Sequence, residues 1–112
     1  MQTNLNLLFI CSRNQWRSPT AEALWRKKAG FQARSAGTSP RARKTVGAAD
    51  IRWADIIFVM EKKHKSKLVA DFGHLLEQKP LHVLDIPDEY KYMDAELIAE
   101  LEAAVSFILE RP

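Results

Sequence analysis

The sequence has one cysteine and no long apolar run. The single thiol, Cys11, excludes an internal disulfide within the 112 residues and is compatible with a reducing compartment. No apolar run approaches the roughly 20 residues that a membrane-spanning helix needs. The start of the chain also lacks the basic segment of a secretory signal. We therefore expect a cytoplasmic protein with no membrane partner.

The sequence also lacks a recognisable metal-binding pattern. Its three histidines, His64, His74 and His82, do not have the paired spacing of metal ligands. We expect each of them to be a surface or strand residue. We accordingly expect no metal and no other cofactor.

Positive charge is concentrated in the first half of the chain. Residues 1–50 hold nine Lys and Arg against two acidic residues, whereas residues 51–112 hold eight against twelve. A basic field of this kind attracts phosphorylated substrates. The cations Arg41, Arg43 and Lys44 lie close together, but no aromatic residues separate them, so we expect no nucleic-acid partner.

Apolar segments alternate with helical patterns along the chain. We predict strands at residues 4–10, 31–35, 54–60 and 81–84, and helices at residues 18–30, 48–53, 61–72 and 94–109. The nearly continuous apolar character of the first strand is typical of a strand buried on both faces. We predict one α/β domain over residues 1–112, a small doubly wound parallel sheet of about four strands with helices on both faces.

Particular residues mark the predicted helix ends. Ser18 is expected to cap the first helix, with Pro19 at its first position. Gly30 and Gly73 are expected to end the first and third helices, and Asp94 to cap the last one.

A loop that begins at a cysteine follows the first strand. Cys11 and Arg17 enclose five residues, and Ser18-Pro19 then open a helix. This spacing can place the thiol at the floor of the loop and the guanidinium at its rim. Loop amides and a helix N-terminus favour a bound anion, and the same field favours thiolate over thiol. A thiolate facing a phosphate is a nucleophile facing an electrophile.

Two aspartates can lie close to the loop that begins at Cys11. Asp85 and Asp88 follow the last predicted strand, and ligands of parallel sheets bind beyond the carboxyl ends of the strands. The departing oxygen of a phosphate ester needs a proton, which a carboxylic acid can supply. Either aspartate can instead form a turn or cap a helix.

The loop resembles the signature of the low-molecular-weight protein tyrosine phosphatase family, a C-x5-R-S loop directly after the first strand. The matching residues are Cys11, Asn14, Arg17, Ser18, Pro19 and the following Ala21-Glu22-Ala23. The sequence is also similar to the family at Ser35-Ala36-Gly37-Thr38, at Met60-Glu61 and at Asp88-Glu89-Tyr90, where the family has D-P-Y. The resemblance implies a phosphatase that acts on phosphotyrosine proteins through a phosphocysteine on Cys11.

The resemblance also implies roles for individual residues. Asp88 would be the general acid, with Asp85 as the alternative acid or as a brace for the loop. Ser18 would donate to the thiolate, Ser35 would hold Asn14, and Tyr90 would line an aryl pocket. The candidate substrate-binding or loop-supporting residues are Ser12, Arg13, Asn14, Gln15, Trp16, Ser18, Ser35 and Tyr90.

The chain departs from the family at several positions. Arg13 replaces a usual glycine, and Trp16 replaces a second cysteine, so a disulfide within the loop is impossible. Trp16 can form a wall of the substrate pocket or anchor the loop on the surface. Lys91 replaces the second tyrosine of the acid motif, and the chain is shorter than typical members.

Three other activities remain open from the sequence. An arsenate reductase would need further cysteines or an external thiol, because Cys11 stands alone. A cysteine phosphocarrier of the sugar-transport type would not need Arg17 or an acid such as Asp88. A non-catalytic phosphate-binding module would retain the loop without turnover.

Overall fold

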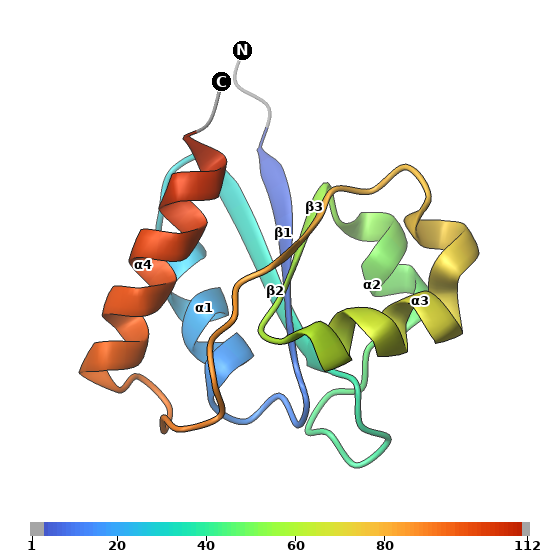
Figure 1. Cartoon of the computed structure of the whole chain (residues 1–112). Helices are drawn as coiled ribbons and strands as arrows, with labels where there is room; N and C mark the ends of the chain where they lie inside the picture. The colour runs from blue at the N-terminus through green and yellow to red at the C-terminus, as the bar shows by residue number, and fades with distance from the viewer. Residues whose placement is uncertain (1–3, 111–112) are drawn as a thin grey trace.

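Four parallel strands form one sheet with the order β2-β1-β3-β4 (Figure 1). The computed structural model describes residues 4–110, so the two ends of the predicted 1–112 domain lie outside the described residues. The strands are β1 (Leu5–Cys11), β2 (Phe31–Gly37), β3 (Ile56–Val59) and β4 (Leu81–Val83). The helices are α1 (Arg17–Trp25), α2 (Ala48–Trp53), α3 (Lys62–Leu76) and α4 (Ala95–Leu109). The predicted fold class is confirmed.

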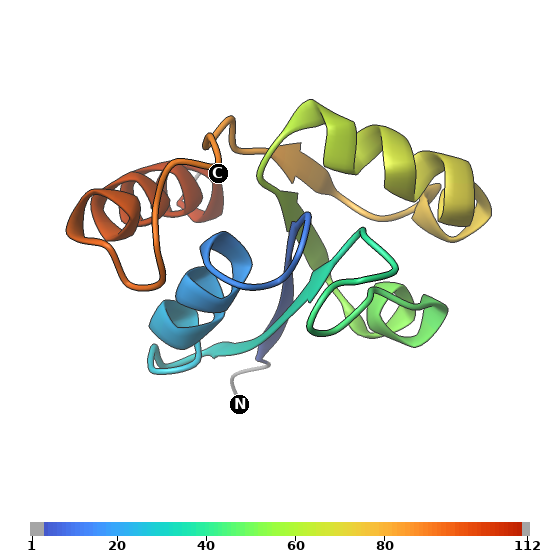
Figure 2. The same cartoon turned by 90° about the horizontal axis from the view of Figure 1, so that it is seen from below.

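Helices cover both faces of the sheet, α1 and α4 on one side and α2 and α3 on the other (Figure 2). The apolar run of β1 serves both faces, because successive side chains of a strand point in opposite directions. Phe9 packs beside Trp25 of α1, with ring centroids 5.8 Å apart. Leu8 and Ile10 belong to the other core, which α3 closes with Leu68. The central strand is therefore fixed from both sides, and so is its carboxyl end.

Several predicted helix ends were wrong. Helix α1 begins before Ser18, with Trp16 as its N-cap, because the Ser18 side chain contacts Cys11 instead of capping the helix. The helix ends at Trp25, and Gly30 makes the turn into β2 with a φ of 89°. Gly73 lies inside α3, which kinks at Phe72 (φ −134°, ψ 20°) and continues to Leu76.

The last helix begins as predicted. The side chain of Asp94 accepts hydrogen bonds from the backbone N–H groups of Glu96 and Leu97, at 2.8 and 3.3 Å. These bonds satisfy donors that the first turn of a helix leaves without partners. The predicted cap is therefore confirmed.

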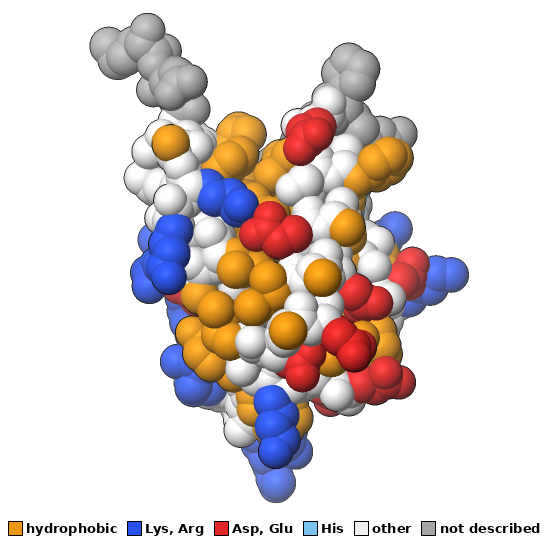
Figure 3. All heavy atoms as spheres, turned by 90° about the vertical axis from the view of Figure 1, so that its left-hand side faces the viewer, with side chains coloured by type: hydrophobic (Ala, Val, Ile, Leu, Met, Phe, Trp, Pro, Cys, Tyr) orange, Lys and Arg blue, Asp and Glu red, His pale blue; other side chains and the backbone are white. Residues whose placement is uncertain are grey.

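The surface on the α4 side is divided by charge. Acidic side chains gather on one part of this face, and Lys and Arg side chains lie along its other edge (Figure 3). A Lys28–Glu102 ion pair of 3.2 Å joins the region after α1 to α4.

No helix within residues 4–110 is long and apolar enough to cross a membrane.

The strand order determines where a site can form. From β1 the chain passes to β2 on one side of it, and later to β3 on its other side. In parallel sheets, ligands bind beyond the carboxyl ends of the strands at such a switch in direction. The carboxyl ends of β1 and β3 are Cys11 and Val59, and the segments that follow them supply most of the candidate site.

Candidate active site

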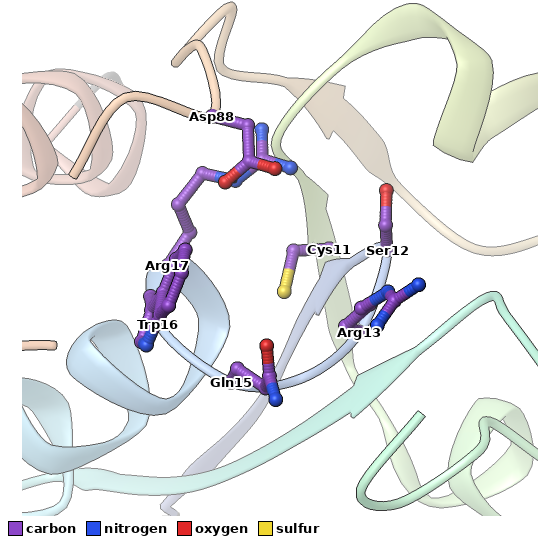
Figure 4. A pocket seen from close by; sticks show the side chains of 7 residues that line it. All are labelled: Cys11, Ser12, Arg13, Gln15, Trp16, Arg17 and Asp88. Atoms are coloured by element: carbon purple, nitrogen blue, oxygen red, sulfur yellow. The ribbon is translucent and has the colours of Figure 1, made fainter. Parts of the chain in front are cut away.

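A cavity of about 250 Å³ lies at the carboxyl end of β1 (Figure 4). It is lined by Cys11, Ser12, Arg13, Gln15, Trp16, Arg17 and Asp88. One loop supplies all of these residues except Asp88, which comes from the segment after β4. Figure 4 shows the sulfur of Cys11 pointing into the bowl that the loop forms. The structure thus brings thiol, guanidinium and carboxylate to one opening.

The segment at residues 38–43 holds the backbone of this loop from outside. Four successive loop carbonyls accept hydrogen bonds of 3.0 Å: Cys11 from the Thr38 N–H, Ser12 from the Ser39 N–H, Arg13 from the Arg43 N–H, and Asn14 from the Arg43 Nε–H. The C=O and N–H of a trans peptide point in opposite directions, and this loop has no cis peptide. The amides of residues 12–15 therefore face the interior of the loop, and none of them donates to a group within residues 4–110. Such an array of N–H groups is suited to an anion.

Gly37 permits the close approach of these two segments. A Cβ atom at this position would lie 2.5 Å from the Ser12 carbonyl oxygen and 2.6 Å from the Ala42 Cβ. Neither contact is possible without moving backbone. The absence of a side chain at the end of β2 is thus a requirement of the loop geometry.

A chain of polar side chains leads to the sulfur of Cys11. The Asn14 amide donates to the hydroxyls of Ser18 and Ser35, at 3.0 and 2.9 Å, and Asn14 has left-handed backbone with a φ of 56°. The Ser35 hydroxyl donates to the Glu22 carboxylate. Ser18 Oγ lies 3.0 Å from the Cys11 sulfur and 3.4 Å from the Ala36 carbonyl oxygen. Because the Asn14 amide already occupies a lone pair of the Ser18 hydroxyl, the one proton of that hydroxyl is left to donate, either to the sulfur or to the more distant Ala36 carbonyl.

The guanidinium of Arg17 is held in place from two sides. It is buried, and its Nη1 donates to Glu61 Oε2 at 2.5 Å and to the Ile86 carbonyl at 2.8 Å. Burial acts to raise the pKa of Glu61, but the hydrogen bond and charge of Arg17 outweigh it and keep that pKa below its usual value. Arg17 Nε lies 3.7 Å from Asp88 Oδ1. Arg17 is also one of the residues that line the cavity.

His64 is a buried neighbour of the loop, so its predicted surface or strand location was wrong. Its side chain is 1% exposed; Nε2 lies 2.8 Å from Ser12 Oγ, and Nδ1 accepts from the Glu61 N–H at 3.0 Å. Burial and the charge of Arg17 lower the pKa of His64 to about 4, with Glu61 and Asp88 opposing the shift. The imidazole is therefore neutral near pH 7.

The chain resembles several solved structures in its fold. No protein-family model matches the sequence, and no curated protein matches it by sequence. In three dimensions the chain is similar to SP-PTP, a low-molecular-weight protein tyrosine phosphatase from Streptococcus pyogenes, with a TM-score of 0.74 and 17% identity over 96% of this chain and 95% of that one. It is also similar to the tyrosine phosphatase Wzb from Escherichia coli K30, with a TM-score of 0.73 and 22% identity over 94% and 96%.

A third similar structure is the YwlE arginine phosphatase from Geobacillus stearothermophilus, with a TM-score of 0.69 and 20% identity over 93% of this chain and 88% of that one. All three similarities extend over nearly the whole chain. The chain has the low-molecular-weight protein tyrosine phosphatase fold.

Within this phosphatase fold, the remaining predicted residues occupy different places. Trp16 is 41% exposed and forms a wall of the cavity, and Arg13 and Gln15 lie on its lining. Asp85, with left-handed backbone (φ 57°), is exposed and borders two shallow hollows outside this cavity. Tyr90 is not among the lining residues, because its half-buried ring packs against the core that α4 covers.

Several residues that support the site in this phosphatase fold were given no role from the sequence, although Glu22, Gly37 and Glu61 lie in segments that resemble the family. They are Glu22, Gly37, Arg43, Glu61 and His64. Arg43 was assigned to a basic cluster without a role. The positions of Glu61 and His64 did indicate a role. Polar residues three positions apart at the start of a helix are typical of side-chain capping. Because this helix follows a buried strand, the two residues lie at the edge of the sheet where ligands bind.

Proposed function

We propose that the chain is a member of the low-molecular-weight protein tyrosine phosphatase family and hydrolyses phosphate monoesters, with phosphotyrosine proteins as substrates. The observation that carries this proposal is a single cavity lined by the Cys11 sulfur, the buried Arg17 guanidinium and the Asp88 carboxylate. The inward-facing loop amides and the fold itself add support.

In the first step, the thiolate of Cys11 attacks phosphorus and the bond from phosphorus to the ester oxygen breaks. Asp88, as the carboxylic acid, gives its proton to the departing oxygen. The loop amides and Arg17 hold the three equatorial oxygens, which matches the demand of phosphoryl transfer for positioning and charge stabilisation. A planar guanidinium suits this role because it binds two oxygens at once.

In the second step, water replaces the sulfur. Asp88, now a carboxylate, takes a proton from water while the water oxygen attacks phosphorus and the P–S bond breaks. The products are inorganic phosphate and the Cys11 thiolate, which the Ser18 hydroxyl at 3.0 Å can stabilise. No redox partner or metal enters this sequence of steps.

The geometry favours Asp88 over Asp85 as the acid. Asp88 lines the cavity and its carboxylate is 3.7 Å from Arg17 Nε, whereas Asp85 borders hollows outside the cavity. Asp88 is also 57% exposed, so it can exchange protons with solvent between the two steps. Asp85 is accordingly the matched control for substitution of Asp88.

The cavity wall supports an aryl phosphate as the substrate. The Trp16 indole stands at the rim of an opening whose floor is the Cys11 sulfur, so a flat ring above the phosphate can pack against it. A phosphoserine side chain is shorter and has no ring for this contact. We expect phosphotyrosine peptides to be preferred over phosphoserine peptides.

Turnover of para-nitrophenyl phosphate tests the proposal. We expect hydrolysis by the wild-type chain, none by Cys11→Ser, a decrease of about 100-fold in Asp88→Asn and near wild-type rates in Asp85→Asn. A larger loss in Asp85→Asn would contradict the assignment of the acid. Stable phosphocysteine without turnover would indicate a carrier, and phosphate binding without labelling would indicate a binding module. Peptides bearing phosphotyrosine, phosphoserine or phosphoarginine then define the substrate, the last because YwlE is an arginine phosphatase.

A further inference from the structure

The residue directly after Cys11 is tied to a distant histidine. Ser12 Oγ lies 2.8 Å from His64 Nε2, across 52 positions of sequence. Ser12 lines the cavity, while His64 is 1% exposed and does not. Figure 4 shows the Ser12 side chain rising from the loop beside Cys11. A buried side chain thus contacts the lining of the cavity through the Ser12 hydroxyl.

The hydrogen bonds of His64 determine where its proton lies. The backbone N–H of Glu61 donates to Nδ1 at 3.0 Å, so Nδ1 is the acceptor nitrogen. In a neutral imidazole the other nitrogen then carries the proton, and Nε2–H donates to Ser12 Oγ. Because the Ser12 hydroxyl accepts this bond with a lone pair, its own hydrogen is turned away from His64.

We propose that His64 is a positioning residue, which fixes the Ser12 hydroxyl as an additional hydrogen-bond donor to a phosphate group in the cavity. The inference rests on the proposed function, because the phosphate is that of the substrate. Ser12 would be the group that touches it, in addition to the loop amides and Arg17. Donors fixed before the reaction stabilise developing charge without reorganising.

The junction of β3 and α3, where His64 lies, also contacts Arg17 at the end of the loop. Glu61, whose N–H donates to His64, also binds the Arg17 guanidinium through its carboxylate at 2.5 Å. The junction of β3 and α3 therefore contacts both Ser12, at the start of the loop, and Arg17, at its end. A disturbance of His64 at Nδ1 affects Glu61, whereas a disturbance at Nε2 affects Ser12 alone.

The charges around His64 favour the neutral ring. The groups that face it are Arg17 from α1, Glu61 and Lys63 from its own corner, and Asp88 from the segment after β4. Burial and the two cations oppose protonation more strongly than the two carboxylates favour it. A proton on Nδ1 would point at the Glu61 N–H, so the arrangement requires neutral imidazole.

Two substitutions separate the role toward Ser12 from the structural role. In His64→Asn, the side-chain oxygen can replace Nδ1 as acceptor for Glu61, but the side chain is too short to reach Ser12. In His64→Gln, the amide nitrogen can replace Nε2 as donor to Ser12, but the acceptor near Glu61 is lost. We expect His64→Asn to keep its melting temperature and lose about tenfold in kcat, and His64→Gln to lose thermal stability and retain kcat.

Ser12→Ala and the double variant Ser12→Ala/His64→Asn complete the test. If His64 acts through Ser12, then His64→Asn, Ser12→Ala and the double variant should all lose the same factor of about tenfold in kcat with para-nitrophenyl phosphate. Wild-type kcat in His64→Asn, or losses that multiply in the double variant, would overturn the proposal.

Binding of inorganic phosphate distinguishes this proposal from the function on which it rests. If the wild-type chain shows no turnover, the proposed function fails, and the dissociation constants for phosphate take the place of kcat. His64→Asn and Ser12→Ala should then weaken phosphate binding equally, and His64→Gln should not. Unchanged binding in His64→Asn would overturn the positioning role by itself.

Discussion

Replacing His64 by asparagine should make the protein less sensitive to acid. Burial and the charge of Arg17 lower the pKa of His64 to about 4 in the folded chain, whereas the unfolded chain has the ordinary value of about 6.5. Between these two values the unfolded chain binds more protons than the folded one. The free energy of unfolding therefore rises with pH through this window and falls on acidification from 6.5 toward 4.

The magnitude follows from the two pKa values. At about 1.36 kcal/mol for each pKa unit, the gap between 6.5 and about 4 corresponds to about 3 kcal/mol of unfolding free energy. Asn at position 64 has no ionisable group and can still accept the Glu61 N–H. The variant should therefore lack this part of the pH dependence.

Urea denaturation of both chains, followed by tryptophan fluorescence, provides the measurement. When the pH is lowered from about 7.5 to about 4.5, the free energy of unfolding of the wild-type chain should fall by about 3 kcal/mol more than that of His64→Asn. The lowered pKa of Glu61 also favours acid unfolding, but Glu61 is present in both chains and cancels in the difference. Parallel loss of stability in the two chains would refute a neutral, buried His64.

Two further substitutions test the loop. Gly37→Ala should destabilise the chain by about 1–3 kcal/mol and abolish turnover, because its Cβ would lie 2.5 Å from the Ser12 carbonyl oxygen. Gly73→Ala, where a Cβ meets nothing within 4 Å, should keep turnover and gain up to about 1 kcal/mol, and equal behaviour of the two would contradict the packing argument. Arg17→Lys should lower kcat about 100-fold or more, since an ammonium cannot hold Glu61 and two phosphate oxygens together; an active lysine variant would contradict bidentate binding.

The sheet and the cysteine loop could be predicted because their signals are local. The run at Leu7–Ile10 is apolar at every position, which is typical of a strand buried on both faces. Asp94 lies just before a long apolar periodicity, and it caps α4 as its position indicates. Neither inference needed knowledge of a distant residue.

The errors and omissions arise where a distant residue competes for a side chain. Ser18 has the chemistry of a cap, but its hydroxyl lies against the Cys11 sulfur and the Asn14 amide. His64 lies on a Lys-rich helix, and its contact with Ser12 joins residues that are 52 positions apart. Arg43 similarly gains its contact with the Asn14 carbonyl from the path of residues 38–43. Periodicity along the chain cannot report such contacts.

Gly73 shows a different limit of sequence reasoning. Glycine lowers the stability of a helix without forbidding it, and α3 continues past Gly73 after a kink at Phe72. Packing of Leu75 and Leu76 against the core offsets the local cost. Helix ends are therefore decided by tertiary contacts as much as by the residues at the boundary.

The most direct test of the account is to find the phosphate on the enzyme during turnover. Asp88→Asn mixed with para-nitrophenyl phosphate, whose leaving group needs little protonation, should accumulate phosphoenzyme because activation of water is impaired. Peptide mapping by mass spectrometry after rapid acid quench should locate the phosphate on Cys11. Phosphate on another residue, or turnover that persists in Cys11→Ser, would contradict a nucleophilic role for this sulfur.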